Sequence, residues 1–135
     1  MTAKQYLRQA YRLNELINSD LEELKQLRAL SNSISSPNLS GMPYGDKKQE
    51  APFENAIIKI VELEKAIDAE INNFVDLKKE IRVVINGIED NNQQLCLRLR
   101  YLRFLKWESV ACEMELSLKQ VHRLHAAALK QIDIH

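Results

Sequence analysis

Apolar residues near the N-terminus recur mostly at spacings of three and four positions. They are Leu7, Tyr11, Ile17, Leu21, Leu24 and Leu27, with polar residues between them. Such spacing gathers the apolar side chains on one side of an α-helix. The pattern therefore predicts an amphipathic helix over about residues 3–30.

A second apolar stripe repeats every seven residues, at Ile60, Ile67, Phe74, Ile81 and Ile88. It is flanked by further apolar residues at Leu63, Ile71, Leu77, Val84 and Ile85. This period predicts a long helix over about residues 53–86 that pairs with the first helix as a hairpin. At about 1.5 Å per residue the second helix is roughly 50 Å long and the first about 40 Å, so apolar surface remains for the C-terminal part or for another copy. We therefore expect a homo-oligomer, most simply a dimer.

Residues 31–52 interrupt the helical patterns. They hold all three prolines and two of the three glycines, a composition that marks a flexible loop. A second break follows the long helix, where Gly87 can end a helix and the polar run from Glu89 to Asn92 can cap the next one. We therefore expect a helical hairpin at residues 1–91 and a separate domain at residues 92–135.

The C-terminal domain has the pattern of two short helices and a longer third one. The first spans about residues 94–103, and the second spans about residues 107–114. Ser117 is placed to cap a third helix that runs to about Ile132. On the first two helices, the side chains expected to face inward are Leu95, Leu99, Leu102, Val110, Ala111 and Met114.

The last two helices, joined by Glu115 and Leu116, have the dimensions of a helix-turn-helix unit. Two steeply crossing helices need a small residue where their backbones approach, and Ala111 meets that need. Val121 and Leu124 follow on the inward face of the third helix. The sequence thus predicts an all-α protein, a long helical hairpin followed by a C-terminal helix-turn-helix domain.

The composition supports an all-α fold and limits the classes of function. Glycine and proline number three each, whereas good helix formers are frequent. The N-terminal residues interleave charges with apolar side chains, unlike an export signal, and no apolar run is long enough to span a membrane, so we expect a cytoplasmic protein with no membrane partner. Cys96 and Cys112 lie in helical patterns and are expected to be reduced core thiols.

The formal net charge is zero, but the charges are unevenly distributed. Residues 1–93 hold 12 Lys and Arg against 15 Asp and Glu, whereas residues 94–135 hold 7 against 4. The C-terminal part is therefore net basic, as a nucleic-acid partner requires.

Three short runs carry a resemblance to a known family: residues 97–101, residues 107–111, and Leu116 and Ser117 followed by residues 121–126. Over about residues 94–132 they resemble region 4 of sigma-70-type factors. They also resemble the C-terminal domain of small phage and prophage regulators of late transcription, the RinA and ArpU type, and this similarity extends more weakly over the N-terminal part. The resemblance implies binding to promoter DNA through the third helix and contact with RNA polymerase. Glu115 stands where related motifs usually have glycine. The backbone at this turn position tends to be left-handed, and a residue other than glycine would be strained there by on the order of 1 kcal/mol.

The start of the third helix carries the candidate DNA-binding residues. With Val121 and Leu124 buried, its outward side chains would face the major groove, as in a recognition helix. Lys119 and Arg123 could contact guanine or phosphate, and Gln120 could read adenine. The alternative is an ordinary solvated helix face. The full candidate set here is Ser117, Leu118, Lys119, Gln120, His122 and Arg123.

The helix before the motif adds candidate phosphate contacts at Arg98, Arg100, Arg103 and Lys106. Surface solubility is the alternative explanation. Trp107 could stack on a base, but its place at the start of a helix favours a partly buried anchor of the small core.

Other chemistry has little support in the sequence. His122 and His125 lie three apart, and with Cys112 they supply three metal ligands, but no fourth has recognisable spacing, so we expect no metal and no cofactor. There is no phosphate-binding glycine loop and no nucleophile elbow, so we expect no enzyme.

The sequence is therefore interpreted as a sequence-specific DNA-binding transcription regulator encoded by a phage or prophage. Its expected partners are double-stranded DNA, RNA polymerase and a second copy of the chain. The alternative is an interaction module that docks on RNA polymerase or another regulator with little DNA contact. A phage packaging subunit is less favoured, because such proteins usually place the DNA-binding unit before the helical stalk.

Overall fold

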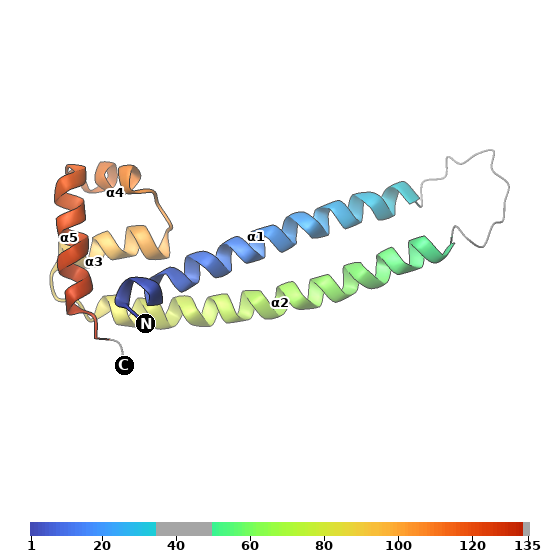
Figure 1. Cartoon of the computed structure of the whole chain (residues 1–135), viewed down its shortest axis with the longest axis horizontal. Coiled ribbons are helices and arrows are strands. Elements are labelled where there is room, and N and C mark those ends of the chain that lie inside the picture. Colours follow the sequence, from blue (N-terminus) through green and yellow to red (C-terminus); the bar gives the residue numbers. More distant parts are fainter. Residues whose placement is uncertain (35–49, 134–135) are drawn as a thin grey trace. The chain divides into compact units, whose positions relative to one another are not determined.

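The computed structural model describes residues 1–34 and 50–133, and within these ranges every regular element is helical (Figure 1). The predicted all-α fold class is therefore confirmed. The predicted flexible loop falls largely on residues 35–49, which lie outside the described residues. The elements are α1 (Ala3–Ile34), α2 (Glu50–Asn86), α3 (Asn91–Leu97), the π-helical turn η2 (Arg98–Leu102), α4 (Trp107–Met114) and α5 (Leu118–Gln131).

Both long helices extend further into residues 31–52 than the sequence suggested. Helix α1 continues to Ile34, with Ser31 buried, and α2 begins at Glu50. Pro52 therefore lies in the first turn of α2, and the prediction that the helix starts after this proline was wrong. The first backbone N–H groups of a helix have no partner within it, so a proline there removes no hydrogen bond.

The chain forms two compact units. The first combines Met1–Asn14 with Asn73–His135, and the second is Glu15–Asn72. The predicted boundary between residues 91 and 92 falls inside the first unit, in the first turn of α3. The first unit crosses this boundary because the start of α1 and the end of α2 pack against the C-terminal helices.

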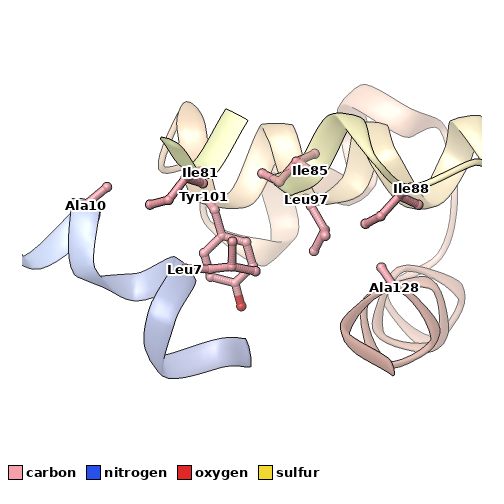
Figure 2. Close-up of a cluster of buried hydrophobic side chains, with 8 residues drawn as sticks. All are labelled: Leu7, Ala10, Ile81, Ile85, Ile88, Leu97, Tyr101 and Ala128. Atoms are coloured by element: carbon pink, nitrogen blue, oxygen red, sulfur yellow. The ribbon is translucent and has the colours of Figure 1, made fainter. Parts of the chain in front are cut away.

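The main core of the first unit draws on all these segments (Figure 2). Leu7, Ile81, Ile85 and Leu97 are fully buried. Burying one such side chain contributes roughly 1.5–3 kcal/mol to folding. The C-terminal half of the apolar stripe that repeats every seven residues is therefore covered within this unit. The sequence predicted that the C-terminal part of the chain could cover such surface. The complete cluster is Leu7, Ala10, Ile81, Ile85, Ile88, Leu97, Tyr101 and Ala128.

The second unit has its own, smaller core. Leu24 of α1 packs with Ile60 and Ile67 of α2, and Leu27 and Leu63 pack against this cluster. The part of the predicted stripe that lies in this unit is thus buried as well. At the surface, an Arg28–Glu64 ion pair of 3.3 Å links α1 and α2. Ile71, predicted to support the stripe, is instead 38% exposed, because it lies toward one edge of the buried face.

The connection between α2 and α3 is tight. The backbone N–H groups of Gly87 and Ile88 donate to the carbonyls of Val84 and Ile85, which closes the last turn of α2. The side chain of Asp90 then accepts a hydrogen bond of 2.9 Å from the backbone N–H of Gln93 and caps α3. The predicted polar cap after Gly87 is confirmed.

Helix α3 widens into η2 before the chain turns. The Arg103 N–H donates to the Arg98 carbonyl five residues earlier, which changes the rotation per residue. Leu95, predicted to face inward, is instead 42% exposed, because the buried face of α3 carries Cys96 and Leu97. Phe104 follows with a left-handed backbone at φ 59°, and its ring lies 5.8 Å from that of Tyr11.

The two cysteines differ in environment. Cys96 is a free, fully buried thiol, and burial raises its pKa to about 11. Cys112 is also free but exposed, so the prediction that it belongs to the core was wrong. It follows Val110 and Ala111 on α4, and the helix rotation carries its side chain to the outer face. Within residues 1–34 and 50–133, no helix is both long and apolar enough to cross a membrane.

Candidate nucleic-acid interface

Helices α4 and α5 are joined by a sharp turn at the predicted position. Glu115 has a left-handed backbone with φ 57° and ψ 41°. Its N–H donates to the Cys112 carbonyl, and the Leu116 N–H donates to the Ala111 carbonyl at 3.0 Å. These bonds satisfy carbonyls at the end of α4 and redirect the chain within three residues.

We expect Glu115→Gly to raise the free energy of unfolding by up to about 1 kcal/mol, because glycine adopts this backbone conformation without strain. Denaturant melts of the full chain would measure the change. The matched control is Glu108→Gly, in the first turn of α4, which should instead lower stability by a similar amount. A loss of stability in Glu115→Gly would show that the carboxylate contributes more than the strain costs.

Ser117 caps α5 as predicted. Its hydroxyl accepts a hydrogen bond of 3.2 Å from the Gln120 N–H, and the Gln120 side chain accepts one of 3.0 Å from the Ser117 N–H. This reciprocal pair fixes the first turn of the helix. It also engages the side-chain oxygen of Gln120 within the chain, although that residue was expected to read a base.

A small core fixes the crossing of α4 and α5. Val110 and Val121 are fully buried and Ala111 is 8% exposed, as the spacing predicted. Cys96 and Leu99 complete the buried set, so α3 and η2 form the base of the motif. Leu116 and Leu124 are partly buried against this cluster.

Trp107 is a partly buried anchor, as expected. The guanidinium carbon of Arg100 lies 4.5 Å from the ring centroid, a cation–π geometry. The rings of His122 and His125 also contact it, at 4.8 and 4.6 Å between centroids. One indole therefore links η2, α4 and α5.

Sequence reasoning missed a buried polar pair beside this tryptophan. The Tyr101 hydroxyl and His125 Nε2 are hydrogen-bonded at 2.6 Å. Burial lowers the pKa of His125 to about 4, with smaller effects from Lys4, His122 and Arg100, and burial raises the pKa of Tyr101 to about 12. The available signal was that His125 lies four residues after Val121, on the same helix face.

The start of α5 is exposed on the opposite face. Leu118 is 42% exposed, and Lys119, His122 and Arg123 are also exposed. Arg123 borders a shallow depression of about 430 Å³ that Leu116, Gln120 and Leu124 also line. A cation therefore stands beside an open concave surface.

The four basic residues before the motif differ in their contacts. Arg100 donates a hydrogen bond of 2.8 Å to the Leu105 carbonyl in addition to covering Trp107, and Arg98 is bonded to the Asn86 side chain. Arg103 is 57% exposed at its side chain, 4.0 Å from Glu113, and Lys106 is exposed. Arg103 and Lys106 therefore remain turned to solvent, whereas the other two help to build the unit.

The division into units also divides the charge. The first unit holds 13 Lys and Arg against 8 Asp and Glu, a net +5, and the second holds 6 against 11, a net −5. The N-terminal cations Lys4, Arg8 and Arg12 belong to the basic unit, where they line one surface depression. Their spacing of four residues was the signal in the sequence. Within the described ranges, no three His, Cys, Asp or Glu side chains are placed to hold one metal ion.

The chain belongs to the DUF1492 family, described as a protein of unknown function, which matches residues 33–133. The match includes the turn at Glu115 and the whole of α5. No curated protein and no solved structure matches the chain.

Proposed function

We propose that this member of the DUF1492 family is a sequence-specific DNA-binding transcription regulator, and that α5 is its recognition helix. The observation that carries the proposal is the exposed group Lys119, His122 and Arg123 on a helix whose first turn is fixed by a capping box. Recognition helices meet base edges in the major groove through such N-terminal side chains. Lysine and arginine there suit guanine and phosphate acceptors.

The packing of the buried face of α5 favours a rigidly held recognition helix. Val121, His125 and Ala128 recur at spacings of four and three on the buried face. The exposed cations on the other face are therefore held in a fixed orientation relative to α4. Preorganisation of this kind reduces the entropy lost when contacts form.

Carboxylates restrict which surface can approach a duplex. Glu108 and Glu113 are exposed on α4, and Glu115 is exposed in the turn, so the outer face of α4 would repel phosphates. Arg103 lies beside Glu113 and reduces this repulsion. Phosphate contacts are therefore assigned to Arg103 and Lys106, and base contacts to α5.

The finer identity of the regulator rests on the resemblance to sigma region 4 and to the RinA and ArpU type. It implies a phage or prophage origin and action on late promoters. RNA polymerase would then be a second partner.

Selection of bound duplexes from a random pool, at controlled salt, tests the proposal directly. We expect a defined motif to be enriched, and its symmetry would report how many copies bind. Recovery of a pool with no sequence preference would contradict sequence-specific recognition.

We expect Arg123→Ala to fold normally and to weaken binding to the selected duplex by about 1–3 kcal/mol, with preference relaxed at one base position. If the guanidinium meets only a phosphate, all sequences should bind more weakly and the salt slope should fall by about one. Fluorescence anisotropy across a salt series measures both. The matched control is Lys130→Ala, an exposed cation in the last turn of the same helix.

The same variant tests the alternative in which the C-terminal part docks on RNA polymerase with little DNA contact. Unchanged DNA affinity at low salt, together with weaker capture of the polymerase, would replace the recognition-helix proposal with that interaction module.

A further inference from the structure

An open groove on the first unit combines apolar and basic residues. It has a volume of about 610 Å³ and lies between α2 and the α3–η2 segment. We call it the basic groove. Its apolar lining is Phe74, Val75, Leu95, Leu99 and Leu102, and its cations are Lys78, Lys79, Arg82, Arg98 and Arg103.

The positive charge of the basic groove is poorly compensated. No carboxylate is among the residues that line the groove. Of its cations, Arg103 lies 4.0 Å from the carboxylate of Glu113, which is outside the groove. Lys78 lies over the Phe74 ring at 5.4 Å, and Lys79 and Arg82 are exposed without an ion-pair partner among the residues described. Val75 and Leu95 leave apolar surface open beside these cations. The groove therefore suits an occupant with both carboxylates and apolar side chains, whereas a DNA duplex would leave the apolar residues without contacts.

The second unit carries a surface of that kind. On α2, a strip beside the buried stripe of Ile60 and Ile67 alternates spacings of three and four residues, and all its members except the half-buried Glu64, which pairs with Arg28, are exposed. Its apolar members Ile57, Val61 and Ile71 are 41%, 45% and 38% exposed. We call it the acidic strip, and its residues are Glu54, Ile57, Val61, Glu64, Asp68 and Ile71. Such spacing is that of a helix seam that packs on a partner.

We propose that the acidic strip of one copy docks in the basic groove of a second copy. The net charges of −5 and +5 on the units that bear them are complementary, and both surfaces expose apolar side chains. Long Lys and Arg stems can cover apolar surface while their charged ends meet carboxylates. Each copy offers one strip and one groove, so reciprocal docking in a two-fold dimer would use all four surfaces. The contact uses none of the exposed residues of α5, and Arg103 is the one residue that it shares with the proposed DNA contacts.

Charge reversal in the full chain tests the pairing. Lys79→Glu with Arg82→Glu reverses the groove, and Glu54→Lys with Asp68→Lys reverses the strip; all four residues are exposed. We expect the wild-type chain to be a dimer by light scattering and sedimentation, and each double variant to associate at least about tenfold more weakly. An equimolar mixture of the two variants, or one chain with all four changes, should regain association because complementary charges face each other again.

A control with the same change in net charge is Lys4→Glu with Arg12→Glu, which lies on the first unit outside the groove. It should dimerise like the wild type. A monomeric wild-type chain would overturn the proposal and leave the groove to an acidic segment of another protein. Double variants that still dimerise, or a mixture that stays monomeric, would also overturn it. Loss of DNA binding without loss of association in the groove variant would assign its cations to phosphates instead.

Discussion

Val121→Asp will unfold the first unit and with it the proposed DNA-binding surface, although Val121 itself is not a proposed DNA contact. Val121 is fully buried and packs with Val110, Ala111, Leu99 and Cys96. A carboxylate there would lose its hydration, at a cost of several kcal/mol. That is a large share of the roughly 5–15 kcal/mol by which an ordinary domain is stable. Circular dichroism should show lost helix and no cooperative melt in the first unit.

Val83→Asp is the matched control, because Val83 belongs to the same unit but is 72% exposed. It should melt within about 0.5 kcal/mol of the wild type and bind DNA normally. Full helicity and a cooperative melt in Val121→Asp would mean that α5 is rotated and that its exposed face has been assigned to the wrong residues.

The second large effect is loss of stability in mild acid, through His125. The folded chain keeps this imidazole neutral down to about pH 4, because burial lowers its pKa, whereas the unfolded chain protonates it near the ordinary value of 6.5. Between these values the unfolded state binds the extra proton. The free energy of unfolding should therefore fall as the pH falls from about 6.5 to 4, by at most about 1.4 kcal/mol per pH unit.

The measurement is the difference between the wild type and His125→Gln in denaturant melts from pH 7 to pH 4.5. Glutamine can still pair with the Tyr101 hydroxyl but does not titrate, so its acid sensitivity should be smaller. His122→Gln removes a histidine that contacts Trp107 and lowers the pKa of His125 only slightly, so it should reduce the acid sensitivity less than His125→Gln does. The comparison is needed because Glu70, whose pKa is raised by desolvation and by Asp20, favours folding as the pH falls. Equal pH slopes in the wild type and His125→Gln would contradict the assignment.

Local signals made much of the C-terminal part predictable. Ser117 and Gln120 lie three residues apart and form a capping box from their own backbone neighbours. The left-handed turn at Glu115 follows from the short connection between two helices with fixed inward faces. The buried positions Val110, Ala111 and Val121 repeat at helical spacing, so their burial needed no information about distant segments.

Three assignments made from the sequence were wrong, and each failed on a detail of a single helix. Leu95 was assigned to the core because it lies one helical turn before Leu99, whereas the buried face of α3 carries Cys96 and Leu97. The start of α2 was misplaced because Pro52 reads as a breaker unless it is known to occupy the first turn. Cys112 was assigned to the core because cysteine in a helical pattern usually behaves as a small apolar residue, whereas it lies exposed on the outer face of α4.

In the candidate site, the sequence predicted which side chains are exposed but not which elements contact each other. Exposure of Lys119, His122 and Arg123 follows from helix phase alone, and the structure places them as the sequence suggested. The engagement of Arg100 by Trp107 depends on how η2 approaches α4, which no spacing rule gives. The basic character of the first unit was underestimated because residues 1–14, which bring three cations, lie far in sequence from residues 73–135, which form the rest of that unit.

The core in Figure 2 joins residues from both ends of the sequence, and this has a consequence for modularity. Leu97, Tyr101 and Ala128 lose their cover if Leu7 and Ile81 are removed, so residues 92–135 cannot be exchanged between proteins as a cassette. A functional graft of α5 would have to carry the first turns of α1 and the end of α2 with it. The evolution of α5 is then tied to that of the hairpin, and recombination within α2 would separate α5 from the residues that cover its buried face.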